Sequence, residues 1–223
     1  MIITEKTSVN FDDGMVYFTM TQEVQEPSTL GRHRIGILGG TFNPPHLGHL
    51  IMAEQVGRQL DLDEVWFMPT AKPPHAPGKQ TIASQHRIQM VQKAIAGNPL
   101  FKLQPYEVNR GGTNYTIDTM RYFIENYPQS DFFFIIGGDS ANDLPSWRGI
   151  DDLVRMVQLV GVQRPGEPPY LHDYPIIWVD SPLIDISSSV VRLRVFLDQS
   201  IRYQVPQAVE EYIYKHHLYS DKV

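Results

Sequence analysis

The sequence predicts an α/β protein built on a doubly wound parallel sheet with helices on both faces. Short apolar runs alternate along the chain with segments whose apolar residues recur at helical spacing. The apolar runs are nearly continuous, which is typical of strands that are buried on both faces of a parallel sheet. Two of these runs end in Gly-Gly, at Gly39-Gly40 and Gly137-Gly138. Because ligands bind at the carboxyl ends of parallel strands, these two endings predict a site.

The individual elements follow from apolar runs, periodicity and breakers. Each expected strand is rich in branched or aromatic residues and stops at glycine, proline or a polar turn. The strands are expected at 34–38, 65–68, 100–103, 132–136, 157–162 and 176–179. The helices are expected at 48–60, 84–96, 116–127, 150–156, 187–197 and 206–217. Residues 163–175 are rich in proline and are interpreted as a loop insertion.

Residues 1–31 differ from the rest. A strand is conceivable at 16–20, but 23–31 has the composition of a polar linker. We interpret 1–31 as an N-terminal extension and 32–223 as a single domain. One expectation for the extension is that it is mobile.

The composition excludes several classes of protein. The net charge of -6 argues against nonspecific binding to nucleic acid, which requires a broad basic surface. The chain has no cysteine, so disulfides, thiolate zinc sites and cysteine nucleophiles are excluded. No apolar run has the length of a membrane span, and the first residues do not resemble a secretory signal. We therefore expect no membrane or nucleic-acid partner and a cytoplasmic location.

The strongest signal is the segment 39–49, Gly-Gly-Thr-Phe-Asn-Pro-Pro-His-Leu-Gly-His, between an expected strand and an expected helix. Gly39 and Gly40 allow a tight turn that brings the backbone close to an anion. His46 and His49 share one side of a helical turn, and Gly48 between them is expected to leave room for a ligand. The helix N-terminus adds free N–H donors. Together these features predict a phosphate site.

Other readings of the segment are weaker. The Gly-x-Gly-x-x-Gly pattern is absent, and no Gly-Lys-Ser/Thr follows, so neither a dinucleotide fingerprint nor a P-loop is present. A metal site on the two histidines lacks a third ligand at the usual spacing. We assign no metal ligand to a protein side chain.

The segment resembles the His-x-Gly-His motif of the nucleotidyltransferase superfamily. The second superfamily element, Ile-Ser-Ser-Thr-x-Ile-Arg, has a counterpart in Ile186 to Arg192, which reads Ile-Ser-Ser-Ser-Val-Val-Arg. Ser187 is also a good helix N-cap. The alternative is that Ser188 and its neighbouring N–H groups meet phosphate, with Arg192 one turn into the helix.

Further fragments resemble the bacterial nicotinate-nucleotide adenylyltransferases, in family order from about Ile35 to Tyr219. They are Trp66–Pro69, Lys72–His75, Asn114–Thr116, Phe134–Asp139, Leu144–Trp147, Gln163–Gly166 and His217–Tyr219. The resemblance implies a Rossmann-like sheet and the transfer of AMP from ATP, with Mg²⁺, to nicotinate mononucleotide.

The resemblance also implies roles at matching positions. His46, His49 and Arg192 would be the catalytic residues that hold the ATP phosphates. Those expected to bind ATP are Gly39, Gly40, Thr41, Gly137, Asp139, Ser187 and Ser188. Tyr115, Thr116 and Trp147 would bind nicotinate mononucleotide, with Trp147 stacking on the ring. Structural alternatives stay open: Thr116 as a helix N-cap, Trp147 as a core residue and Asp139 as a helix cap.

The sequence departs from the family at two places. Ala76 replaces a common lysine, so either Lys72 or Lys79 is left to reach the substrate phosphate, and Asn43 stands where many relatives have Asp. Three other functions stay open: adenylylation of nicotinamide mononucleotide or pantetheine phosphate, a non-catalytic nucleotide-binding module, and a fragment of an aminoacyl-tRNA synthetase. A homo-oligomer is neither indicated nor excluded.

Overall fold

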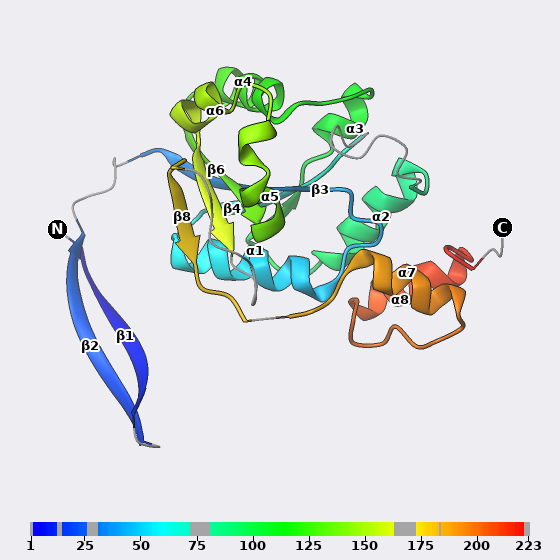
Figure 1. The fold of residues 1–223 in the computed structure, drawn as a ribbon, viewed down its shortest axis with the longest axis horizontal. Coiled ribbons are helices and arrows are strands. Elements are labelled where there is room, and N and C mark those ends of the chain that lie inside the picture. The colour runs from blue at the N-terminus through cyan, green and yellow to red at the C-terminus, as the bar shows by residue number, and fades with distance from the viewer. Residues whose placement is uncertain are drawn as a thin grey trace. The chain divides into compact units, whose positions relative to one another are not determined.

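The computed structural model describes residues 2–12, 15–25, 31–71, 81–162, 173–182 and 184–220, with side chains from Gly31 onward except that of Asp139. By internal contacts, the chain divides into two units, Met1–Arg32 and His33–Val223. Each unit is described by itself (Figure 1).

In the second unit, six strands form one sheet in which every pairing is parallel. The strands are β3 (His33–Gly40), β4 (Glu64–Pro69), β5 (Phe101–Leu103), β6 (Ser130–Gly137), β7 (Gln158–Val162) and β8 (Ile176–Val179). Their order is β5-β4-β3-β6-β7-β8. The order reverses between β3 and β6, so the carboxyl ends of these two strands flank the switch point of a doubly wound sheet. The predicted fold class is confirmed.

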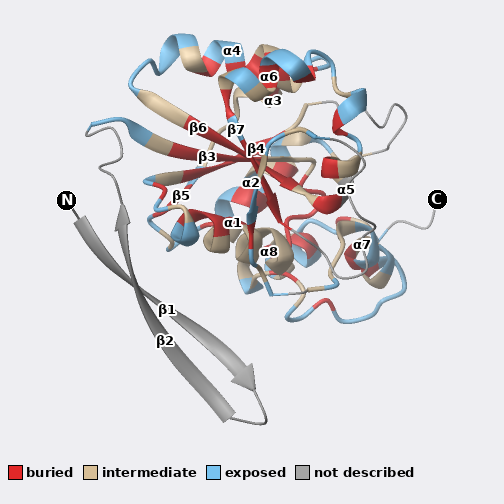
Figure 2. Cartoon of the chain, turned by 60° about the vertical axis from the view of Figure 1, so that its left-hand side comes forward, coloured by how far each residue is buried: buried red, intermediate tan, exposed pale blue. Residues whose placement is uncertain are grey.

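Helices cover both faces of the sheet. Side chains alternate along a strand, so β3 sends Ile35 and Ile37 to one face and Leu38 to the other. The first face packs against α4 (Thr116–Asn126) and α6 (Ile150–Met156), and the second against α1 (Leu47–Gln59) and α2 (Ser84–Ala94). In Figure 1, α4 and α6 lie above the strands and α1 lies below them. Figure 2 shows that burial is concentrated on the strands between these layers.

A third apolar cluster joins the end of the chain to α2. It contains Met90 of α2, Val191 and Val195 of α7 (Ser188–Phe196), and Val209 and Ile213 of α8 (Gln207–Lys215). This packing brings α7, which carries the second motif, to the same side of the domain as α2.

Short elements were not predicted from the sequence. They are α3 (Tyr106–Arg110), α5 (Gly138–Asn142) and the 3₁₀ turn Leu144–Ser146, each too short to display a helical period. The predicted strands and the longer helices are present, with ends that move by at most two residues. Most of the predicted loop insertion, at 163–172, lies outside the described residues.

The first unit is a hairpin. β1 (Ile2–Asp12) pairs antiparallel with β2 (Met15–Gln25). The expectation of a polar linker from Glu23 onward is wrong for Glu23–Gln25, because these residues pair with Thr4, Ile3 and Ile2. Backbone pairing tolerates the polar side chains that suggested a linker.

Candidate active site

A cavity of about 330 Å³ lies at the carboxyl ends of β3 and β6, where the strand order reverses. Seven residues predicted to bind a substrate line it: Gly39, Gly40, Thr41, His49, Thr116, Gly137 and Trp147. The rest of the lining includes Met52, Met68, Thr70, Glu107, Asn114, Phe134 and Ser140. The structure therefore brings together glycine-rich loops, an imidazole and an indole from distant parts of the chain.

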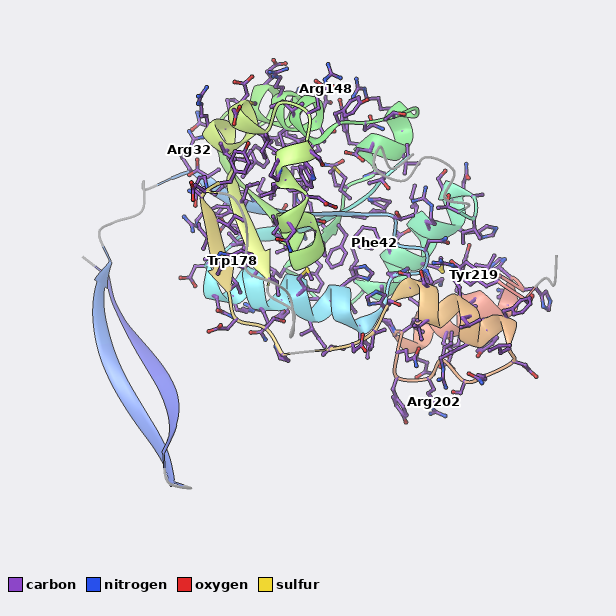
Figure 3. The ribbon with its side chains drawn as sticks, viewed as in Figure 1. Arg32, Phe42, Arg148, Trp178, Arg202 and Tyr219 are labelled. Atoms are coloured by element: carbon purple, nitrogen blue, oxygen red, sulfur yellow. The ribbon has the colours of Figure 1, made fainter. Side chains whose placement is uncertain are left out.

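The loop after β3 turns sharply over a buried phenylalanine. Phe42 is 2% exposed and has a positive φ of 48°, which is uncommon for a residue other than glycine. Its ring lies beneath Gly40, where an added Cβ would come within 3.2 Å of the ring, and it packs edge-on against His49 at 5.0 Å between centroids. A side chain at position 40 would therefore have to displace the Phe42 ring slightly. Figure 3 labels Phe42 next to β3.

The two histidines of the motif form a stacked pair at the start of α1. Their ring centroids are 3.7 Å apart, with an angle of 31° between the ring planes. The backbone N–H of His46 donates to His49 Nδ1 over 3.1 Å. His46 is the N-cap residue and is 5% exposed, whereas His49 lines the cavity. The predicted shared side is confirmed, but only His49 is among the residues that line the cavity.

The expectation that Gly48 leaves room for a ligand is wrong. A Cβ at Gly48 would lie 3.1 Å from His46 Nδ1, 3.2 Å from His46 Cε1 and 3.8 Å from the Ile186 carbonyl oxygen. The space above Gly48 is occupied by the His46 imidazole, so the glycine serves the packing of that ring.

The second motif binds the loop of the first. Arg192 Nη1 donates to the Asn43 carbonyl over 2.8 Å, and Ser188 Oγ donates to the Pro44 carbonyl over 2.8 Å. Ser187 is the N-cap of α7, and its Oγ accepts from the Val190 N–H over 3.2 Å. Ser187, Ser188 and Arg192 do not line the cavity. Ser188 and Arg192 hold the loop that leads from it to His46, and Ser187 caps the helix that carries them.

Asn43 binds Tyr219, a residue far along the chain. Its side chain is buried, and Asn43 Oδ1 accepts from the Tyr219 hydroxyl over 2.8 Å. Burial raises the pKa of Tyr219, against the influence of Arg192 and Arg87, so the phenol stays protonated as a donor. In Figure 3, Tyr219 is labelled beside α7 and α8.

The candidates for the second substrate differ in position. Thr116 and Trp147 line the cavity, and the Trp147 ring meets Phe134 edge-on at 6.0 Å. Tyr115 does not line it, and its ring lies under the Arg148 guanidinium at 4.7 Å. The N-cap of α4 is Tyr115 rather than Thr116, and Thr116 is the first residue of the helix. The Asp139 side chain and both candidate lysines, Lys72 and Lys79, lie outside the described residues.

Comparisons with known proteins agree on one family. The model of the cytidylyltransferase-like family matches residues 37–194. A probable nicotinate-nucleotide adenylyltransferase of Lactiplantibacillus plantarum is 54% identical over 202 residues, covering 90% of this chain and 95% of the relative. One of Enterococcus faecalis is 48% identical, covering 86% and 87%. The chain belongs to the nicotinate-nucleotide adenylyltransferase family.

Solved structures show the same fold. The nicotinic acid mononucleotide adenylyltransferase of Plasmodium falciparum, complexed with NaAD, aligns with a TM-score of 0.71 at 21% identity, covering 84% of this chain and 97% of that one. A putative nicotinate-nucleotide adenylyltransferase of Vibrio parahaemolyticus gives 0.66 at 18% identity, covering 85% and 97%. The relatives and the family model above confirm the nicotinate-nucleotide adenylyltransferase family that the sequence motifs resemble, and with it a nucleotidyltransferase that uses ATP.

Three polar residues at this adenylyltransferase site were not predicted as functional. Glu107 is 4% exposed, lines the cavity and accepts from Thr119 Oγ1 over 3.0 Å, and burial raises its pKa to about 7. Asn114 Nδ2 donates to the carbonyls of Glu107 and Gly111. Arg87 donates to the Thr41 carbonyl over 2.8 Å. Glu107 lies in a short helix and Arg87 in a regular amphipathic one, where a polar residue gives no periodic signal. Asn114 lies in a loop, and the sequence indicated it only as part of the fragment Asn114–Thr116.

Proposed function

We propose that the protein transfers the AMP part of ATP to nicotinate mononucleotide, giving nicotinate adenine dinucleotide and pyrophosphate. The observation that carries this proposal is one cavity at the switch point of the sheet, lined by the Gly39-Gly40-Thr41 loop, His49, Thr116 and Trp147. Family membership, at 54% identity to a probable nicotinate-nucleotide adenylyltransferase, supports the same assignment.

ATP binds at the glycine-rich ends of β3 and β6. The Gly39, Gly40 and Thr41 backbone lies beneath the phosphates, and Gly137, with Asp139 after it, faces the ribose. The backbone N–H of His46 donates to His49 Nδ1, so in a neutral His49 the proton is on Nε2. Nε2 then donates to a phosphate oxygen. His46 supports this arrangement by stacking on His49.

The second motif adds positive charge. Arg192 provides a guanidinium suited to phosphate, and Ser187 and Ser188 place the N-terminus of α7 beside the phosphate loop. These residues also fix the loop, since Arg192 and Ser188 both bond to its carbonyl groups.

Nicotinate mononucleotide binds on the α4 side of the cavity. The Trp147 indole stacks on the pyridine ring, and Thr116 and Tyr115, at the start of α4, recognise its carboxylate through N–H groups of the helix terminus. Arg148 lies over the Tyr115 ring near that end of the helix, where it also pairs with Asp118 of the first turn over 3.6 Å.

The reaction needs no strong general base. The second pKa of a phosphate monoester is about 6, so the acceptor phosphate is already largely a dianion at neutral pH. One of its oxygens attacks the α-phosphorus of ATP in line, and the bond from that phosphorus to the oxygen bridging to the β-phosphorus breaks. Pyrophosphate leaves with the electron pair. The chain supplies position and positive charge through His49, His46 and Arg192.

The residues of the site fit a magnesium ion that arrives on the triphosphate. In the described part of the chain, no three His, Asp or Glu side chains cluster around a possible ion. Asn43, beside the phosphate loop, has its side-chain oxygen occupied by Tyr219. Mg²⁺ is commonly held by substrate phosphates, water and few protein ligands, and it would neutralise charge on the departing pyrophosphate.

A pyrophosphate-release assay tests the function. We expect release with ATP, Mg²⁺ and nicotinate mononucleotide, and a kcat/KM at least about 10-fold lower with nicotinamide mononucleotide, which lacks the carboxylate that the helix terminus recognises. A preference for nicotinamide mononucleotide or pantetheine phosphate would replace the proposed acceptor. No release with any acceptor would identify a non-catalytic nucleotide-binding module.

The working location we propose is the cytoplasm, where both substrates are expected. Every helix in the described ranges is too short or too polar to cross a bilayer.

A further inference from the structure

Arg87 is a buried cation that the chemistry above does not use. It lies in α2, is 1% exposed and is among the largest fully buried side chains of the described residues. Burial lowers the pKa of its guanidinium, but arginine remains charged in proteins. An ionised side chain in the interior is strongly destabilising unless an opposite charge compensates for it.

The described residues supply only part of that compensation. Arg87 Nη1 donates to the Thr41 carbonyl over 2.8 Å, while Nε is buried and has no hydrogen-bond partner among the described residues. The titratable neighbour beside it is the Tyr219 phenol, which burial keeps protonated and therefore uncharged. Among the described side chains, no carboxylate forms an ion pair with Arg87. The cation therefore has a carbonyl dipole but no counter-charge.

The position of Arg87 points to where the counter-charge comes from. Thr41, whose carbonyl it holds, lines the cavity. Arg87 from α2 and Arg192 from α7 bind the carbonyls of Thr41 and Asn43, on either side of Phe42. The peptide bond between Thr41 and Phe42 is trans, so its N–H and its carbonyl point in opposite directions. Because the Thr41 carbonyl faces Arg87, the Phe42 N–H points away from Arg87. Two guanidinium groups thus hold the loop by its carbonyl oxygens. Their charges favour a positive electrostatic potential at the loop.

We propose that Arg87 is a positioning residue for the triphosphate site. The polyphosphate of ATP supplies the negative charge that balances Arg87, which no described carboxylate provides. This inference rests on the proposed function. A purely structural contact between α2 and the loop would need only a donor for the Thr41 carbonyl, and a neutral side chain could provide it. Such a contact does not explain why the side chain is charged.

The test separates the charge from the hydrogen bond. R87Q keeps a donor and loses the charge, whereas R87K keeps both in a different shape. The probe is inorganic tripolyphosphate, measured by its effect on Tm and by titration calorimetry. We expect R87Q to bind tripolyphosphate at least about 10-fold more weakly than wild type and to raise the KM for ATP more than that for nicotinate mononucleotide. R87K should stay within about 3-fold of wild type in tripolyphosphate affinity.

Arg34→Gln is the matched control. Arg34 also donates to a backbone carbonyl, that of Leu60 over 2.9 Å, and lies over the Phe133 ring, but it is at the amino end of β3, away from the cavity. Its substitution should leave tripolyphosphate affinity unchanged. Wild-type affinity in R87Q, or an equal loss in R87K and R87Q, would overturn the inference while wild type still releases pyrophosphate. A wild type that neither binds tripolyphosphate nor releases pyrophosphate would overturn the proposed function as well.

Discussion

At the residue scale, the two stacked imidazoles of the first motif have different surroundings. His49 lines the cavity, while His46 is buried and packs over Gly48. The bond from the His46 N–H to His49 Nδ1 fixes the orientation of the outer ring before any ligand arrives. A donor that is already oriented stabilises charge in a transition state without reorganising.

We therefore expect His49→Ala to lower kcat by about 10²-fold or more, the scale for losing one oriented donor. Steady-state pyrophosphate release measures this effect. His33→Ala is the control, since His33 is half-exposed at the other end of β3, 3.3 Å from Asp63, and should retain turnover. Near-normal turnover in a folded His49→Ala protein would remove His49 from the mechanism.

Sequence reasoning at this scale could propose residues only where a pattern exists. The histidines and glycines stand together in one segment, and Arg192 follows a recognisable serine run. Arg87 stands in an ordinary amphipathic helix, and its importance depends on a contact with Thr41, 46 positions earlier. Such a contact is created by packing between α2 and the sheet, and no local spacing encodes it.

At the scale of elements, the start of α7 assigns different tasks to adjacent serines. Ser187 Oγ accepts from the Val190 N–H as the helix cap, whereas Ser188 Oγ donates to the Pro44 carbonyl. Ser187→Ala should lower the free energy of unfolding by about 1 kcal/mol, the usual value for a lost cap. Ser188→Ala should mainly raise the KM for ATP, because it loosens the phosphate loop.

The two serine variants act as controls for each other, with denaturant unfolding and ATP kinetics measured on both. Equal effects of the two substitutions on KM for ATP would show that the cap and the loop contact are not separable.

Glu107 links α3 to α4 through Thr119 and makes stability depend on pH. Its folded pKa, about 7, is raised above the ordinary 4.5 by burial, so the folded protein binds the proton more tightly than the unfolded chain does. The protonated Glu107 therefore stabilises the folded protein fully below pH 4.5, and this stabilisation is lost as the pH rises to 7. The difference between the two pKa values corresponds to about 3 kcal/mol in the free energy of unfolding. Glu107→Gln resembles the protonated form, so it should match wild type near pH 4.5 and be more stable at pH 8.

Unfolding in denaturant between pH 5 and 8 measures that difference. Glu54→Gln is a control of opposite sign, because bonds from Arg58 and Asn98 lower the pKa of Glu54, and its loss should destabilise the protein at pH 8. A difference between Glu107→Gln and wild type that does not change with pH would contradict the expectation for Glu107.

The longer elements were predictable because each carries its own period. β6, the run of aromatic and branched residues from 132, is buried on both faces, as a central parallel strand must be. α3, on which Glu107 lies, has five residues and depends on Asn114, which bonds to the carbonyls of Glu107 and Gly111. A helix that is held by a later loop cannot be recognised from its own residues.

At the scale of the whole molecule, strand order determines where chemistry takes place. β3 pairs with β4 on one side and with β6 on the other, so the chain returns to the centre of the sheet after building one half. The loops after β3 and β6 diverge there, and the cavity forms between them. The sequence could predict which strand ends carry glycine, but only the pairing decides that these two ends are neighbours.

The division of the chain into Met1–Arg32 and His33–Val223 leads to the last prediction. The six-stranded sheet and its three apolar clusters lie within 33–223, and among the described strands β1 pairs with β2 alone. A protein that begins with Met followed by Arg32 should therefore unfold cooperatively, with kcat and both KM values within about 2-fold of the full chain, because it lacks no strand of the sheet and no lining residue of the cavity. Kinetics and thermal unfolding of the two proteins in parallel provide the comparison. A 10-fold rise in either KM, or loss of a single cooperative transition, would mean that the hairpin completes the substrate site or the core, and the active unit would then extend beyond residues 33–223.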